Sequence, residues 1–78
     1  MILIMLNGEA YRLNTQNLDH NLETNPTLAD LLSQLQLTHK RVAVELNQQI
    51  IPRSQHASTI LHTDDQIEIV HAIGGGLA

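Results

Sequence analysis

One segment of the chain has the periodicity of an α-helix, and segments of β character lie on both sides of it. Four leucines form its apolar stripe: Leu28, Leu31, Leu32 and Leu35. Thr27 is placed to cap the helix, and Asp30 completes a capping-box pattern that also complements the helix dipole. Lys40 and Arg41, just beyond the expected end of the helix, are expected to face the negative end of that dipole. A helix in this position must cover one face of a sheet.

Five other segments are predicted to be strands, so the order is strand, strand, helix, strand, short strand, strand. The predicted strands are residues 2–6, 10–14, 42–46, 50–51 and 66–71. Asn7-Gly8 predicts a hairpin between the first two, because both residues tolerate positive φ. The strand after the helix is expected to return to the sheet by a crossover, which makes the sheet mixed. This is the order of the β-grasp architecture, an α+β fold, although other small α+β arrangements share it.

The length and composition of the chain predict one compact domain. Its 78 residues are 42% hydrophobic and contain no cysteine, which excludes disulfides, thiolate zinc sites and cysteine nucleophiles. The apolar residues 1–6 lack a basic leader and are too short for a membrane span. We therefore expect a cytoplasmic protein with a folded domain at residues 1–73, an extended loop at 15–25, and a flexible glycine-rich tail at 74–78.

The charged and aromatic residues do not favour nucleic-acid binding. The net charge is −4, Tyr11 is the only aromatic residue, and the four basic residues form no stripe. The histidines, expected to be scattered over surfaces and loops, lack the spacing of a metal site: His20, His39, His56, His62 and His71. Ser54, Ser58 and His56 are close in sequence, but nothing supplies an oxyanion hole or an orienting acid. No enzyme signature emerges.

The glycine run Gly74-Gly75-Gly76 is the candidate functional feature. It is no phosphate-binding loop, because no helix follows it. From the glycines alone, a frayed end and a functional tail are equally plausible. A tail without Cβ atoms is suited to a narrow channel in another protein, where it would present a carboxylate for activation as an acyl phosphate or acyl adenylate.

Three segments resemble the ThiS family, the sulfur carriers of thiamin-thiazole biosynthesis. They are residues 42–53 (VAVELNQQIIPR), residues 64–70 (DDQIEIV) and the glycine run. The resemblance implies a protein co-substrate without a bound cofactor. A ThiF-like, E1-type enzyme would use ATP to adenylate the terminal glycine carboxylate. A sulfur donor fed by a cysteine desulfurase would convert it to a thiocarboxylate, and a ThiG-like thiazole synthase would accept the sulfur.

The resemblance also implies particular site residues. Gly76 would carry the thiocarboxylate, after a protease removes Leu77-Ala78, since family members end at the glycine. Such carriers dock by a sheet face, and alternation places Met5, Ala43 and Val70 on the face opposite the helix, near the tail. The loop at residues 15–25 is longer than is usual in the family.

Three alternatives remain open from the sequence. One is a sulfur carrier for molybdopterin or cysteine synthesis, which the segment 47–53 favours less than the thiazole type. Another is a protein modifier of the ubiquitin sort, in which the glycine carboxylate is joined to lysines. The last is a plain interaction domain whose tail has no role.

Overall fold

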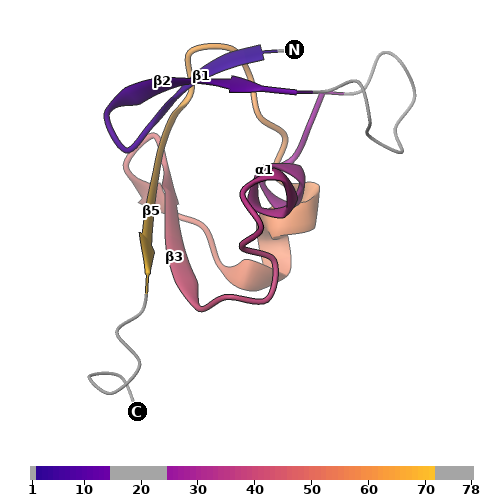
Figure 1. Ribbon diagram of the computed structural model, residues 1–78. Helices are drawn as coiled ribbons and strands as arrows, with labels where there is room; N and C mark the ends of the chain where they lie inside the picture. Colours follow the sequence, from indigo (N-terminus) through magenta and orange to yellow (C-terminus); the bar gives the residue numbers. More distant parts are fainter. Residues whose placement is uncertain (1, 15–24, 72–78) are drawn as a thin grey trace.

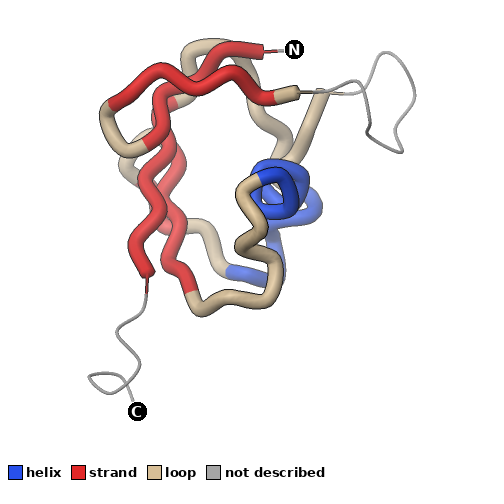
Figure 2. Tube along the Cα trace, in the orientation of Figure 1, coloured by secondary structure: helices blue, strands red, loops and turns tan. Residues whose placement is uncertain are grey.

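The chain folds as a five-stranded mixed sheet with one main helix across one face (Figure 1). The computed structural model describes residues 2–14 and 25–71. Its elements are β1 (Ile2–Leu6), β2 (Glu9–Leu13), α1 (Leu28–Gln34), β3 (Val42–Leu46), β4 (Gln49–Ile50), the 3-10 helix η1 (Arg53–Ser58) and β5 (Gln66–His71). The strand order is β2-β1-β5-β3-β4, and β1 and β5 are the parallel pair (Figure 2). The predicted mixed α+β sheet is confirmed.

Two tight turns close the antiparallel hairpins of the sheet. Between β1 and β2, Asn7 and Gly8 have φ values of 50° and 83°. Between β3 and β4, Asn47 and Gln48 have φ values of 50° and 72°. Both turns therefore have the two positive φ angles that match the twist of a two-residue hairpin. The Asn7-Gly8 hairpin is confirmed, and β2 and β4 each begin one residue earlier than the sequence predicted.

The start of α1 is as predicted, but its end is not. The Thr27 backbone N–H donates to Asp30 Oδ2 at 2.8 Å, and the Asp30 N–H donates to Thr27 Oγ1 at 3.3 Å, which completes the capping box. The chain then leaves the helix at Gln36, whose φ is 61°. Lys40 and Arg41 come after this reversal, and no basic residue lies in the last turn, so their expected dipole role was wrong. No helix among the described residues is long and apolar enough to cross a membrane.

The core lies between α1 and the inner face of the sheet, and all its fully buried apolar side chains in the described region are aliphatic. They are Ile4, Leu13, Leu28, Leu31, Leu32, Val44, Leu61, Ile67 and Ile69. Leu35, the fourth residue of the predicted stripe, and Tyr11 pack against this cluster while partly exposed. Burial of each such aliphatic side chain contributes about 1.5–3 kcal/mol. Val44 of β3 and Ile67 and Ile69 of β5 therefore face the core, in line with the alternation of side chains along a strand.

η1 lies beside α1 and contains one residue that the sequence placed wrongly. His56 is only 6% exposed, whereas all the histidines were expected on surfaces or in loops. Its Nε2 donates to the carbonyl oxygen of Ile51 at 3.0 Å, so burial does not leave this ring nitrogen without a partner. His20 lies outside the described residues.

Two asparagine side chains bind the backbone of β5. Asn7 Oδ1 accepts from the Ile69 N–H at 2.8 Å, and its Nδ2 donates to the Ile69 carbonyl oxygen at 3.3 Å. Asn47 Oδ1 accepts from the Gln66 N–H at 2.9 Å, and its Nδ2 donates to Asp65 Oδ1 at 3.1 Å. The Asn7 amide therefore links the β1–β2 turn to β5. The Asn47 amide links the β3–β4 turn to the start of β5.

We expect Asn7→Gly to lower the free energy of unfolding by about 1–3 kcal/mol, because glycine keeps the positive φ but removes both bonds to Ile69. Urea unfolding followed by circular dichroism measures the change. Asn7→Ala should cost more, because alanine also disfavours positive φ. An Asn7→Gly variant as stable as the wild type would show that these bonds contribute nothing.

We expect Gln48→Gly to raise the free energy of unfolding by about 0.5–1 kcal/mol, because it relieves a side chain held in the left-handed region. Gln49→Gly is the matched control, since Gln49 is equally exposed but lies in β4. The control should lower stability in the same urea experiment. Destabilisation by both substitutions would contradict the assigned turn conformation.

Candidate functional site

The predicted reactive tail follows directly from the central strand of the sheet. β5 ends at His71, which is still paired with Val42 of β3. Gly74, Gly75 and Gly76, together with Leu77-Ala78, lie outside the described residues, as do residues 15–24 of the predicted loop. The described part of the candidate site is therefore β5 and the sheet face beside it.

The face of the sheet that points away from α1, here called the outer face, carries side chains from all five strands. Its residues are Ala10 and Arg12 of β2, Leu3 and Met5 of β1, Gln66, Glu68 and Val70 of β5, Ala43 and Glu45 of β3, and Ile50 of β4. No helix of the described chain covers this face (Figure 1). Several large apolar side chains on it are consequently exposed to solvent.

The structure places the three predicted docking residues on this outer face, but not all at the same end. Ala43 is exposed and lies directly opposite Val70, which is 61% exposed. This pair lies one residue before the end of β5, and so close to the tail. Met5 is 37% exposed and lies beside Gln66 at the start of β5. Their docking role stays a prediction, with Ala43 and Val70 nearest to the tail.

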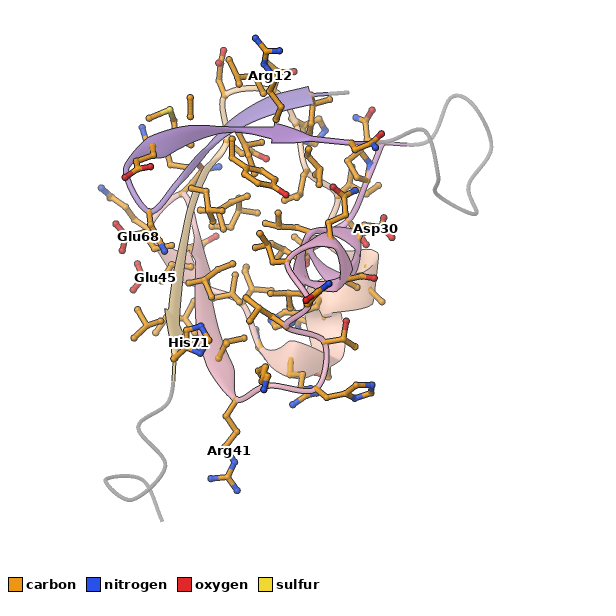
Figure 3. The ribbon with its side chains drawn as sticks, in the orientation of Figure 1. Arg12, Asp30, Arg41, Glu45, Glu68 and His71 are labelled. Carbon is orange, nitrogen blue, oxygen red and sulfur yellow. The ribbon has the colours of Figure 1, made fainter. Side chains whose placement is uncertain are left out.

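Sequence reasoning missed other exposed residues of the outer face. Ile50 is 74% exposed and lies opposite Glu45, and Glu45 in turn lies opposite Glu68 (Figure 3). Alternation along β3 and β5 already places both glutamates on the outer face. Only the register of the two strands shows that they are direct neighbours.

A hollow of about 160 Å³ on the helix side of the described structure is lined by Ala29, Leu32, Thr38, Arg53, His56 and Ala57. Its polar side chains make bonds within the fold. Arg53 Nη2 donates to the Thr38 carbonyl oxygen at 2.8 Å. In η1, but outside the lining of the hollow, Ser58 Oγ donates to the Gln55 carbonyl oxygen at 3.1 Å. With His56 bonded to Ile51, these contacts fix the loop around η1. Within residues 2–14 and 25–71, no cluster of acidic or histidine side chains is suited to a metal ion.

Comparison with protein families gives a match over nearly the whole chain. The model of the ThiS family matches residues 4–76, a span that includes all three glycines of the run.

Curated relatives are of two kinds. The chain is 46% identical over 50 residues to the sulfur carrier protein ThiS of Bacillus subtilis. This match covers 64% of this chain and 76% of the relative. It is 42% identical over 73 residues to a thiazole synthase of Magnetococcus marinus. That match covers 94% of this chain but 20% of the thiazole synthase, so the chain spans about one fifth of that relative's length.

A solved structure shares the fold. The crystal structure of the thiamine biosynthesis protein (ThiS) of Geobacter metallireducens superimposes with a TM-score of 0.71, over 96% of this chain and all of that chain, at 24% identity. This likeness confirms the β-grasp fold that the element order predicted. With the family match and the B. subtilis relative, it leads to one conclusion: the chain belongs to the ThiS family.

Proposed function

We propose that this protein is a sulfur carrier for thiamin biosynthesis, a co-substrate whose Gly76 carboxylate is converted to a thiocarboxylate. The observation that carries the proposal is the ThiS family match, which extends through the glycine run to residue 76. The relative from B. subtilis, itself named a sulfur carrier protein, supports it. Leu77 and Ala78 lie beyond the family match, and removal of both residues by a protease before the chemistry is part of the proposal.

The proposed chemistry has two steps. First, an oxygen of the Gly76 carboxylate attacks the α-phosphorus of ATP on a ThiF-like, E1-type enzyme, and pyrophosphate leaves. Second, a hydrosulfide ion attacks the acyl carbon, AMP leaves with the electron pair of the broken C–O bond, and loss of the S–H proton leaves the thiocarboxylate. Where the cysteine desulfurase delivers the sulfur as a persulfide, the attack forms an acyl disulfide, and a thiol then reduces it to the thiocarboxylate and is itself oxidised to a disulfide. The carrier supplies the acyl group, and its partners supply the catalysis and the ATP site. Glycine suits this role because it adds no Cβ next to the reacting carbon.

The proposed sulfur acceptor is a ThiG-like thiazole synthase in the cytoplasm. The thiazole synthase of M. marinus supports this partner, because a segment similar to this chain is part of the same polypeptide. Ala43 and Val70, with Met5 further along the sheet, are the proposed docking residues.

The length of the tail suits a partner that holds the outer face and acts on Gly76. Gly76 comes five residues after His71, the last residue of β5 (76 − 71 = 5). An extended peptide of that length reaches about 16 Å. A partner docked at Val70 can therefore act on Gly76 if its active site lies within about this distance of the end of β5.

We expect a chain ending at Gly76 to gain sulfur when incubated with a ThiF-like enzyme, ATP and sulfide. Intact-mass spectrometry would show the exchange of one oxygen for one sulfur. The chain ending at Ala78 should not gain sulfur under the same conditions, because its carboxylate is not on a glycine. Gly76→Ala in the shortened chain should react more slowly, because its methyl group crowds a channel shaped for glycine.

The shortened chain keeps all of residues 2–14 and 25–71, which contain the buried core. Failure of that chain to react, with an enzyme that activates the B. subtilis carrier, would contradict the proposal. Appearance of conjugates to lysine side chains instead of a thiocarboxylate would favour a ubiquitin-like modifier.

A further inference from the structure

The outer face holds two carboxylates that repel one another. The register of β3 and β5 puts Glu45 directly opposite Glu68. Directly opposed residues on one face have Cβ atoms about 4.5–5.5 Å apart, and like charges at that spacing destabilise the sheet. Figure 3 shows both side chains on the side of the sheet that points away from α1. The opposition of the two charges is therefore unfavourable for the sheet.

The described part of the chain does not neutralise the pair. Neither glutamate makes an ion pair there. Arg12, the basic residue of the outer face, lies on β2 and is separated from β5 by β1. Arg41 precedes Glu45 by four positions (45 − 41 = 4), which is about 13 Å along a strand. Figure 3 shows Arg12 and Arg41 pointing away toward opposite ends of the molecule.

Exposed aliphatic side chains border the carboxylate pair. On one side, the pair Ala43 and Val70 lies next along the same two strands, toward the tail. On another side, Ile50 lies opposite Glu45 on β4 and is 74% exposed. A partner that covers these residues removes water from the carboxylates and strengthens any charge interaction made there. Arginine is the charged residue that is enriched at the centre of protein interfaces, where surrounding contacts exclude water.

We propose that the protein that activates the tail recognises the outer face through an arginine, whose guanidinium lies between Glu45 and Glu68. This inference rests on the proposed function and names the chemistry of its docking partner. A guanidinium has five N–H donors in one plane, so it bonds both carboxylates at once, which a lysine ammonium does less well. Apolar side chains of the partner cover Val70, Ala43 and Ile50. The repulsion within the free carrier is then replaced by attraction in the complex.

Removal of either glutamate charge should change the stability of the free carrier and its affinity for the partner in opposite directions. Glu45→Gln and Glu68→Gln should each raise the urea midpoint of the free carrier, because one of two repelling charges is removed. Each should also weaken binding to the ThiF-like enzyme by about tenfold or more, since a desolvated charge pair is lost. Isothermal titration calorimetry with the carrier ending at Gly76 measures the second effect. The wild-type affinity should fall as salt is added, and that of the double variant should change less.

Glu9→Gln is the matched control, because it removes the same charge from β2 at a residue paired with Leu6, away from the outer face. Its affinity should equal that of the wild type. Equal affinities of Glu45→Gln, Glu68→Gln and wild type would overturn the inference, as would equal weakening by all three variants. Loss of both stability and affinity would also overturn it, because the glutamates would then be structural.

Two further outcomes separate this inference from the function on which it rests. If the wild-type carrier is activated normally but the glutamine variants bind with the same affinity, the arginine contact is overturned. The proposed sulfur-carrier function then remains intact. A wild-type carrier that neither binds nor is activated overturns both. If the free chain self-associates and the glutamine variants abolish this self-association, the outer face binds a second copy of the chain. That result would overturn the arginine contact.

Discussion

The pairing of β5 in the centre of the sheet is the interaction on which the rest of the structure depends. It joins the β1–β2 hairpin to the β3–β4 hairpin, and the described residues show no direct pairing between those hairpins. Ile67 and Ile69 of β5 are buried in the core, and Asn7 and Asn47 bind the backbone of β5 from both sides. Without β5, two small hairpins remain, and an isolated hairpin is at best marginally stable in water.

The two faces of the sheet differ in how far their side chains are buried. The inner face, with α1, η1 and the loop residue Leu61, holds the aliphatic core of the described residues. The outer face contributes little to that core, so it is free to carry exposed apolar residues and opposed charges. In a small domain, where only about 60% of the unfolded surface is buried, such a division leaves little stability to spare. The strands that carry the outer face are the same strands that carry the core residues on their other face.

Much of this fold was predictable from the sequence because its signals are local. The capping box at Thr27 and Asp30, the Asn7-Gly8 hairpin and the alternation in β5 each depend on neighbouring residues. The misplaced features depend on contacts between distant segments. Burial of His56 requires α1 to pack against η1, and the opposition of Glu45 and Glu68 requires a register that alternation alone does not set. For the candidate site, the sequence predicted the face and its residues, whereas the charge arrangement needed the register.

Because β5 lies in the centre of the sheet, the order of synthesis determines when the sheet can form. Of the described strands, β5 is the last to leave the ribosome, yet it lies between the first strand and the third. The complete sheet therefore cannot form on a nascent chain until almost all described residues have emerged. Pairing of β1 with β5 closes a loop of about sixty residues, and such distant contacts slow folding. Cells that make this protein have a folded carrier only when the segment leading to the glycine run has itself been made.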